Sequence, residues 1–235
     1  MIYRGDLHIH TTLSPCGDLE MTPVQILERA KALSWDFIGI TDHNDTRQAP
    51  IIATLGNQMG ITVFIGAEIC SSEEVHLLAY VPTEMARAAL QEYLKTYRLK
   101  VANRACYFGD QVVVSTDEMI LINEEDLLLT ALSQDVYQVT DFVHSLGGVV
   151  VAAHVDRPSY SLISTLGFIP DDLPLDGVEY YRSSEEIDST KWCCIQNSDA
   201  HYLKDMQPNR CEYHMSHLSF DGLKTCFRNH QIHII

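Results

Sequence analysis

The chain has 235 residues, of which 46% are hydrophobic, so it is long enough for one large domain or for a core domain with a small insertion. No apolar run approaches the length of a membrane-spanning helix and the N-terminal segment turns polar at once, so we expect a soluble, cytoplasmic protein with no membrane partner. The formal net charge of −16 disfavours a long nucleic acid as a partner and leaves a small anionic substrate, provided that a bound cation offsets the charge at the site.

The first third of the chain alternates short apolar runs with amphipathic segments, a pattern typical of strands that alternate with helices. Thr22 and Pro23 match the residues preferred at the N-cap and in the first turn of a helix. We therefore expect strands at residues 2–9, 36–41, 62–67 and 75–80, and helices at about residues 22–33 and 48–59.

Residues 84–146 do not follow this alternation. Their pattern predicts one long helix at 84–106, a hairpin of strands 111–115 and 119–122 joined by the polar turn 116–118, and two helices at about 124–132 and 136–146. We interpret this segment as a mainly helical insertion that forms a lid or side subdomain over the site, or as a structural insertion without contact to the substrate.

The alternation resumes after the insertion, with strands expected at residues 148–153, 176–180 and 192–197 and a closing helix at 219–229. Strands that alternate with helices are joined by helical crossovers and lie parallel, so the pattern predicts an α/β barrel or an open α/β sheet. In either fold the chemistry gathers at the carboxyl ends of the strands.

Histidines and carboxylates gather where the predicted strands end, and six of the eleven histidines lie at such positions. His8 and His10 stand two residues apart on a strand, so their side chains share one face, and Asp199 and His201 repeat this spacing. Imidazoles and carboxylates that converge at one barrel mouth suit divalent zinc, manganese or iron. The strand-end residues are His8, His10, Asp42, His43, Glu68, His76, His154, Asp199 and His201.

Six motifs that contain these residues resemble the PHP (polymerase and histidinol phosphatase) domain: DLHIHTTLSPCGD, ITDHND, GAEI, EVHLLAY, AAHVDRP and SDAH. They extend from residue 6 to residue 201, so the resemblance covers most of the chain. It implies an α/β fold, a distorted seven-stranded (β/α)7 barrel, that forms a single domain over residues 1–235 with the insertion at about 84–146. It also implies a hydrolase that binds three divalent metal ions (Mn, Fe or Zn) and cleaves phosphate esters.

The resemblance also implies a metal ligand at each of nine positions, and Glu68 would bridge two of the metals. Grouped by metal, the ligands are His8, His10, Glu68 and Asp199 for the first, Glu68, His76 and His154 for the second, and Asp18, His43 and His201 for the third.

The third ligand set departs from the family pattern at one position. Most members have Ser-Asp-Gly shortly after the second histidine, whereas this chain has Ser-Pro-Cys-Gly-Asp. Counting back from the helix start at Thr22 and Pro23 restores the register at Asp18, and Gly17 lets the backbone turn the following side chain inward. We therefore expect Asp18 as the ligand. The alternative is Cys16, whose thiolate would favour zinc, where a carboxylate tolerates manganese and iron.

A metal-activated hydroxide is the nucleophile that this ligand set implies. Three divalent cations would outweigh the three ligating carboxylates and make the pocket positive inside an acidic protein. They would polarise the phosphoryl oxygens and lower the pKa of a bound water towards about 7, so that it attacks phosphorus in line with the leaving oxygen. We expect Glu68 to be the bridging catalytic ligand, and Asp199 or His201 to protonate the leaving oxygen.

Three further residues are candidates for substrate contacts. Arg157 closely follows a ligand histidine and can grip phosphate through two hydrogen bonds, and the alternative is a salt bridge within its loop. Arg182 and Asn44 are secondary candidates of the same kind. Asp6 and Asp42 precede ligand histidines, and we expect them either to orient imidazoles or to contact solvent.

Three functions compete for this site. We favour a phosphomonoesterase that acts on a small phosphorylated substrate such as histidinol phosphate or a nucleotide. The second is a phosphodiesterase or nuclease that takes short oligonucleotides or bisphosphate nucleotides, and the third is a metal-binding regulatory module without turnover. The complete ligand set argues against the third function. The acidic composition argues against a nuclease of long polymers but not against one that takes dinucleotides. The pattern predicts no particular oligomeric state.

Overall fold

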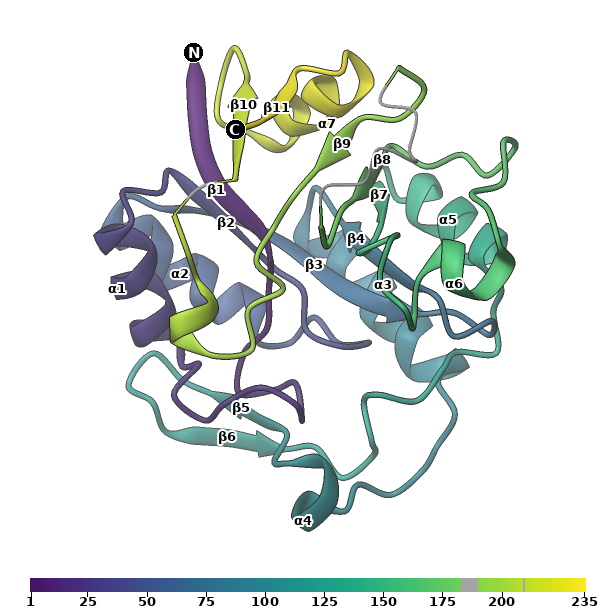
Figure 1. Cartoon of the computed structure of the whole chain (residues 1–235). Helices are drawn as coiled ribbons and strands as arrows, with labels where there is room; N and C mark the ends of the chain where they lie inside the picture. The colour runs from purple at the N-terminus through teal and green to yellow at the C-terminus, as the bar shows by residue number, and fades with distance from the viewer. Residues whose placement is uncertain (183–189, 209) are drawn as a thin grey trace.

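The computed structural model of the protein describes residues 1–182, 190–208 and 210–235, and within those ranges its central feature is a sheet of nine strands. The strands are β1 (Ile2–Ile9), β2 (Phe37–Ile40), β3 (Thr62–Cys70), β4 (His76–Tyr80), β7 (Val149–Ala152), β8 (Gly177–Glu179), β9 (Cys194–Ile195), β10 (Cys211–His214) and β11 (Ile232–Ile234). Their order is β11-β10-β1-β2-β3-β4-β7-β8-β9 (Figure 1). β1, β2 and β3 run parallel, as do β7, β8 and β9, whereas β4 lies antiparallel between β3 and β7.

The chain that follows β9 closes this sheet into a barrel. Ala200 forms a parallel bridge with Ile9 of β1, with hydrogen bonds from His10 N to Ala200 O at 3.0 Å and from Ala200 N to His8 O at 3.2 Å. The expected α/β barrel class is therefore confirmed. The sheet has nine strands rather than seven because β10 and β11, which were not predicted, pair antiparallel beside the first residues of β1.

Two helices cover the side of the barrel formed by β1, β2 and β3. α1 (Pro23–Ala32) begins after the N-cap Thr22, whose side chain accepts a hydrogen bond from Gln25 N, as the sequence predicts. α2 (Ala49–Met59) follows β2, and both helices bury their apolar faces in one cluster with Ile38 of that strand. The local pattern determined these elements because each one buries a single apolar face on the sheet.

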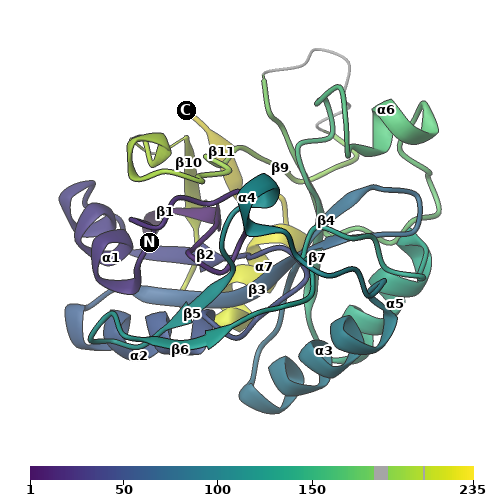
Figure 2. The same ribbon diagram turned by 90° about the horizontal axis from the view of Figure 1, so that it is seen from below.

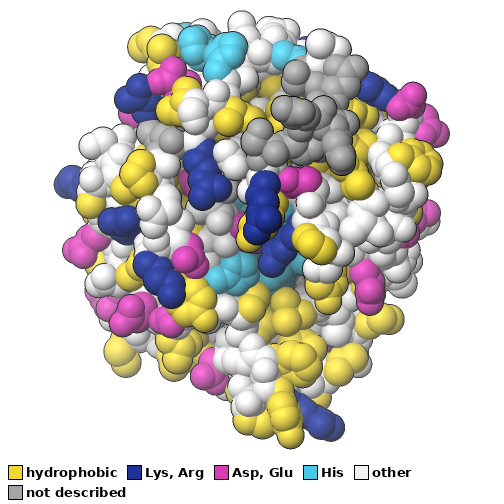
Figure 3. Space-filling view, in the orientation of Figure 1, with side chains coloured by type: hydrophobic (Ala, Val, Ile, Leu, Met, Phe, Trp, Pro, Cys, Tyr) yellow, Lys and Arg dark blue, Asp and Glu magenta, His cyan; other side chains and the backbone are white. Residues whose placement is uncertain are grey.

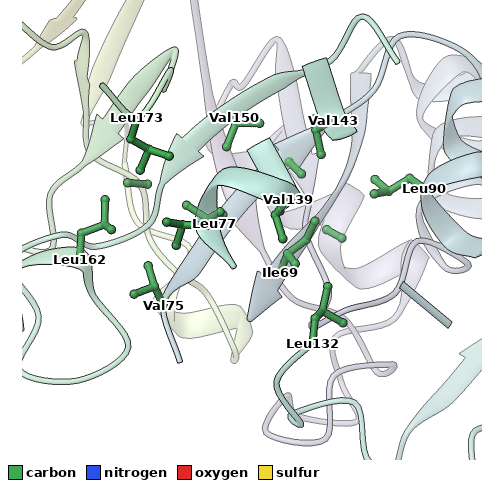
Figure 4. Packing of buried hydrophobic residues seen from close by; sticks show 14 of the residues in the cluster. Ile69, Val75, Leu77, Leu90, Leu132, Val139, Val143, Val150, Leu162 and Leu173 are labelled. Carbon is green, nitrogen blue, oxygen red and sulfur yellow. The ribbon is translucent and has the colours of Figure 1, made fainter. Parts of the chain in front are cut away.

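Two more helices, α3 (Glu84–Tyr97) and α5 (Val136–Ser145), cover the flank formed by β3, β4 and β7 (Figure 2). Val139 and Val143 of α5 pack into the same buried cluster as Leu77 of β4 (Figure 4). A short helix, α6 (Leu162–Leu166), and a 3-10 turn at Leu203–Asp205 were not predicted. In the described part of the chain, no helix is both long enough and apolar enough to cross a membrane.

The amino-terminal end of the barrel is filled with apolar side chains and closed by α7 (Phe220–Arg228), the helix expected at 219–229. Phe227 of this helix joins the cluster of Phe37 and Tyr213, whose rings meet edge to face with centroids 4.9 Å apart. Because this end is packed, the carboxyl ends of the strands are the place where the barrel can receive a ligand.

The insertion differs from its predicted form. Its first helix ends at Tyr97, well before its expected end, because the chain then pairs with a distant segment through bridges from Arg98 to Leu132 and from Ala102 to Asp126. The same pairing replaces the first of the two helices expected after the hairpin. Helices α3 and α5 remain the largest elements of the insertion, but one predicted helix is shorter than expected and another is absent because of this long-range pairing.

The hairpin of the insertion is confirmed as β5 (Val112–Val114) and β6 (Ile120–Asn123), with one turn of helix, α4 (Ala105–Phe108), before it. These elements lie at the carboxyl ends of the barrel strands, opposite α7 (Figure 1). This part of the insertion therefore lies at the end of the barrel that the apolar core leaves open, whereas α3 and α5 cover its flank (Figure 1).

Candidate metal centre

Glu68, near the carboxyl end of β3, lies among imidazoles from three other segments and has 1% of its surface exposed. Its Oε1 lies 2.8 Å from His76 Nδ1 and 3.0 Å from His154 Nε2. Its Oε2 lies 3.0 Å from His43 Nδ1. One buried carboxylate thus connects the ends of β2, β4 and β7.

His8 and His10 of the β1 end bring two more imidazoles to the same carboxylate. His8 Nε2 lies 3.4 Å from Glu68 Oε1 and 3.3 Å from Asp199 Oδ1. His10 Nε2 lies 3.3 Å from both Glu68 Oε2 and Asp199 Oδ1. One ligand atom from each of these four residues lies within 4.8 Å of the others, a spacing that one ion can bridge.

His201 extends this cluster toward the pocket mouth. Its ring stacks on that of His10 with centroids 4.1 Å apart, and its Nδ1 donates a hydrogen bond to Asp199 O at 2.8 Å. Two further groups of ligand atoms lie within 4.8 Å of one another: His10, His43 and His201 in one, and His43, Glu68 and His76 in the other. The structure therefore brings together eight of the nine implied ligands, and Asp18 is the one left outside.

The donor atoms of this centre fit a metal ion. Glu68 Oε2 and Asp199 Oδ1 are buried and have no hydrogen-bond partner among the described residues, although imidazole nitrogens lie near both. A buried carboxylate oxygen without a partner is costly, and a bound cation removes that cost. Carboxylate oxygen and imidazole nitrogen are ligands that zinc, manganese and iron accept.

Burial and charge set the protonation states in the ring of imidazoles and carboxylates around Glu68. Burial opposes the ionisation of Glu68, but electrostatic interactions with the imidazoles around it, His76 foremost, hold the pKa of its carboxyl well below its usual range. Burial lowers the pKa of His76 to about 4, which leaves this imidazole neutral and able to bind a metal. Burial also opposes a charge on His8, but nearby carboxylates, Glu179 foremost, raise its pKa well above the usual value. A cation that binds His8 must therefore displace a proton.

Glu179, at the end of β8, was not identified from the sequence. It is buried, and its carboxylate lies 3.0 Å from His8 Nδ1 and accepts hydrogen bonds from His154 N at 3.0 Å and Asn197 Nδ2 at 2.7 Å. The Nδ1 contact fixes the ring of His8 and directs its Nε2 to the cluster. The strand-end rule would have found this residue, because Glu179 lies in the strand predicted at 176–180.

Asp42 and Asp6 are both buried and support the ring in different ways. Ser14 Oγ donates a hydrogen bond to Asp42 Oδ1 at 2.7 Å and lies 2.9 Å from His10 Nδ1, so Asp42 orients an imidazole through a hydroxyl. Asp6 instead accepts a hydrogen bond from the backbone N–H of His8 at 2.9 Å. Neither residue is the solvent contact that was left open as an alternative.

Three residues at the strand ends have left-handed backbone conformations, with φ of 46° at Asn44, 29° at His154 and 50° at Asp199. Residues with a side chain seldom adopt this region, at a cost of about 1–3 kcal/mol each, and such residues cluster at functional sites. The sharp turns at these positions aim the neighbouring ligand side chains into the barrel mouth.

Part of the ring around Glu68 lines a pocket of about 210 Å³. Figure 3 shows histidine side chains at the bottom of a hollow, with basic side chains beside it. Arg157 lies at this pocket, with Nη1 2.8 Å from Asp199 Oδ2 and 38% of its side chain exposed. Leu129 shows that the insertion contributes to the wall. The lining residues are Cys16, His43, Glu68, His76, Leu129, Arg157, Tyr160, Asp199 and His201.

Two of the predicted substrate contacts lie outside this pocket. Asn44 is fully buried, its Nδ2 donates to Leu128 O at 2.8 Å, and its Oδ1 accepts from Cys70 N at 3.1 Å. Its role as a substrate contact is therefore corrected: it holds the insertion against β3. Arg182 is exposed, and its guanidinium lies 5.4 Å from the ring centroid of Tyr181.

The loop between β1 and α1 places Cys16, rather than Asp18, at the pocket. Asp18 Oδ1 accepts a hydrogen bond from Glu20 N at 2.8 Å, and Asp18 is not among the residues that line the pocket, whereas Cys16 is. Part of Cys16 faces solvent, but its thiol contacts the imidazoles of His43 and His201. Partial desolvation raises the pKa of this thiol, but the charge of His43 and contacts with both imidazoles lower it to about 5.

Comparison with known proteins identifies the family to which this sequence is similar. The model of the PHP domain family matches residues 6–165. Among curated proteins, an uncharacterized protein of Methanocaldococcus jannaschii, MJ1587, is 36% identical over 78 residues, which cover 30% of this chain and 46% of that protein. The chain thus matches about half the length of this relative.

Solved structures share the fold. The lesion-specific endonuclease PfuEndoQ from Pyrococcus furiosus superposes with a TM-score of 0.75 at 19% identity, over 97% of this chain and 56% of that chain. An Endonuclease Q complex with a 27-mer duplex carrying an abasic lesion gives 0.74 at 19% identity, over 97% of this chain and 57% of that chain. A protein from Bifidobacterium adolescentis, described as a metal-dependent phosphoesterase, gives 0.59 at 20% identity, over 87% of this chain and 89% of that chain.

Proposed function

This chain belongs to the PHP domain family, and on that premise we propose that it is a metal-dependent hydrolase of phosphate esters with a site for three divalent cations. The observation that carries the proposal is the buried ring around Glu68, where two carboxylate oxygens have no hydrogen-bond partner among the described residues. Six imidazoles surround the carboxylates of Glu68 and Asp199, which is the ligand chemistry of zinc, manganese and iron.

Two of the three proposed cation sites share Glu68. Bound divalent cations supply an activated water and polarise the phosphoryl oxygens of a substrate. The residues that would hold the first cation are His8, His10, Glu68 and Asp199, whose ligand atoms lie within 4.8 Å of one another. Glu68 with His76 and His154, which contact its Oε1, would hold the second. His43 and His201, which lie in one group of ligand atoms with His10, would hold the third together with a residue of the β1–α1 loop.

Arg157 is the residue that would hold the substrate phosphate. Its guanidinium reaches the pocket, pairs with Asp199 through Nη1 and remains partly exposed. Because a guanidinium presents several N–H donors in one plane, it can keep this pairing and still donate to phosphate oxygens. In this proposal Arg157 binds and orients the phosphoryl group.

Asp199 and His201 are the two candidates for protonating the leaving oxygen. Burial opposes the ionisation of Asp199, but neighbouring imidazoles, His8 foremost, hold the pKa of its carboxyl well below its usual range. It therefore stays ionised and serves as a ligand and as the partner of Arg157. His201 is one-fifth exposed and uses Nδ1 to hold a backbone carbonyl, so Nε2 is the nitrogen left either to bind the third cation or to protonate the leaving oxygen. It can protonate that oxygen only while no cation occupies Nε2.

The pocket favours a small phosphomonoester, such as histidinol phosphate or a nucleotide. Its volume of about 210 Å³ takes one phosphoryl group and part of a leaving group. The insertion narrows it through Leu129, which favours a small substrate over a bulky one. This preference rests on the size of the enclosed space and on the single guanidinium at its mouth.

A second candidate, phosphodiester hydrolysis, is favoured by a wider groove of about 590 Å³ that continues from the pocket. The cationic side chains that line the groove outnumber the carboxylates, and two tyrosine rings lie beside them. The cations are Arg157, Lys204 and Arg210, the carboxylates Asp199 and Asp205, and the rings Tyr181 and Tyr202. Cations that track a phosphate chain and rings that stack on bases are typical of single-stranded nucleic-acid sites. The exclusion of long nucleic acids rested on net charge alone, and both this local concentration of cations and the duplex complex of the related fold weaken it.

A substrate panel separates these candidates. Protein loaded with manganese, iron or zinc is assayed with p-nitrophenyl phosphate, histidinol phosphate, nucleoside monophosphates, bis-p-nitrophenyl phosphate and dinucleotides, beside Glu68→Gln as the inactive control. Faster hydrolysis of monoesters supports the first candidate, and faster hydrolysis of diesters supports the second. Failure of the folded, metal-loaded protein to hydrolyse any of them contradicts both and leaves a metal-binding regulatory module.

A further inference from the structure

The loop between β1 and α1 carries the one place where the chain departs from the expected ligand pattern. We infer that the Cys16 thiolate, rather than the Asp18 carboxylate, completes the cation site of His43 and His201, and that it makes this site selective for zinc. The inference deepens the proposed function because it names the ligand and the metal preference of one of its three sites.

The position of Cys16 is the first observation. Its thiol contacts the imidazoles of both His43 and His201, and the three residues line the same pocket. A second observation is independent of the cysteine. Glu68 in the same pocket has only 1% of its surface exposed, and its Oε2 has no hydrogen-bond partner among the described residues. That oxygen lies 3.0 Å from His43 Nδ1. A buried carboxylate oxygen that accepts no hydrogen bond therefore lies next to His43, and a cation bound there would compensate it.

The backbone of the loop fixes this direction. Gly17 N donates to Ser14 O at 2.8 Å, which closes a turn of four residues with Cys16 at its third position. A side chain at Gly17 would place its Cβ only 2.6 Å from Thr11 O, so the turn is this tight because residue 17 is glycine. The turn presents residue 16 to the pocket before the chain leaves toward α1.

The insertion holds the same loop from the other side. Gly109, with a φ of 99°, packs so closely on the backbone of Pro15 that a Cβ there would clash with Pro15 O, far inside van der Waals contact. The residue that precedes Cys16 is therefore pressed between the insertion and the barrel. This packing keeps the thiol at the mouth and gives the insertion a role in the geometry of the site.

Asp18 is committed elsewhere in the loop. Its Oδ1 accepts a hydrogen bond from Glu20 N at 2.8 Å, and its own N donates to His201 O at 2.8 Å. Moving the carboxylate into the pocket would break the first bond and strain the second. The glycine that was expected to turn Asp18 inward turns the chain at Cys16 instead.

The ligand chemistry gives the selectivity. A thiolate with two imidazoles is a ligand set that zinc accepts, whereas manganese prefers carboxylate and water oxygens. The sites built from Glu68 and Asp199 contain carboxylates and tolerate manganese or iron. A centre with one sulfur-containing site is therefore expected to retain one zinc ion when its other positions exchange.

Cobalt substitution provides the test, because a Co²⁺–thiolate bond absorbs in the near ultraviolet and the readout does not depend on turnover. The full chain is reconstituted with Co²⁺ as wild type, Cys16→Ser and Asp18→Asn, with Cys106→Ser as a control for an exposed thiol. We expect the band in wild type, Asp18→Asn and Cys106→Ser, and its loss in Cys16→Ser. Zinc retained after dialysis should fall by one ion per chain in Cys16→Ser alone.

A conservative variant guards against misfolding. Cys16→Asp restores an acidic ligand, so it should recover the third ion with manganese but lack the near-ultraviolet cobalt band. Loss of the ion in Asp18→Asn with the band retained in Cys16→Ser would overturn the inference. If phosphate esters are hydrolysed normally in that case, the proposed function stands without this ligand. If the band follows Cys16 but no ester is hydrolysed, the ligand stands without the proposed function.

Discussion

The two ends of the barrel interior are built from opposite chemistry. At the amino end, Phe37 and Tyr213 pack edge to face in one apolar cluster with Phe227 of α7. At the carboxyl end, carboxylates and imidazoles crowd around Glu68 with contacts of 2.8 to 3.4 Å. The first arrangement stabilises the fold by close packing, whereas the second destabilises it until cations bind. The packing of the amino end therefore offsets the destabilising burial of charged groups at the carboxyl end.

Metal removal should have the largest effect on stability, because it leaves the buried carboxylates at the carboxyl end without cations. Cations that bind only the folded state stabilise it by about 4 kcal/mol per site at a thousandfold excess over Kd. Chelation should therefore lower the melting temperature strongly. Calorimetry of loaded and chelated protein measures the change, with metal loss verified by elemental analysis. An unchanged melting temperature after verified loss contradicts the account.

Phe227→Ala should break the packed end instead. The side chain is fully buried, so its truncation should cost about 3–5 kcal/mol of the free energy of unfolding. Phe227→Leu keeps most of the volume and should cost less. Urea unfolding measures both variants, and each should bind as many cations as wild type. Loss of cations in Phe227→Leu would show that the two ends are coupled.

Glu179→Gln should act only on the crowded end. It removes the charge that orients His8 but no ligand, so cation affinity should fall by about 10–100-fold. Glu212→Gln is the matched control, since Glu212 lies on β10 and pairs with Arg4. Competition with a metal indicator measures the affinity of both variants. Equal affinities would show that Glu179 has no part in orienting the ligand.

Arg157→Ala should have the smallest effect, because Arg157 contacts the ring only at its rim. Losing one charged phosphate contact should raise KM by about 10-fold and change kcat little. Arg182→Ala is the control, because Arg182 lies outside both the pocket and the groove. A fall in kcat with KM unchanged would mean that Arg157 acts on the reaction rather than on binding.

The barrel end of the molecule could be read from the sequence because its signals are local. Each strand is a short apolar run, and the functional residues follow directly, as His43 follows β2 and His154 follows β7. Glu179 obeys the same rule, because it lies in the strand predicted at 176–180, but it was not among the residues predicted for the site. Most of the residues around Glu68 could therefore be predicted from local sequence patterns, without information on distant contacts.

The insertion and the β1–α1 loop could not be read in this way. The stretch from Arg98 to Ala102 looked helical but is held extended by partners about 25 to 35 residues away, which no local pattern encodes. β10 was missed because it is short and gains its place from pairing with the start of β1. The choice between Cys16 and Asp18 depends on the turn at Gly17, whose direction only the folded loop determines.

The central claim is that Glu68 joins the cation sites into one centre. Elemental analysis of Glu68→Gln, reconstituted with manganese and desalted beside wild type, tests it most directly, with circular dichroism to confirm folding. The account predicts that the variant loses at least two cations per chain and that phosphate-ester hydrolysis falls by more than the roughly 100-fold that loss of an outer partner can cost. A folded Glu68→Gln protein that keeps the wild-type number of cations would contradict it.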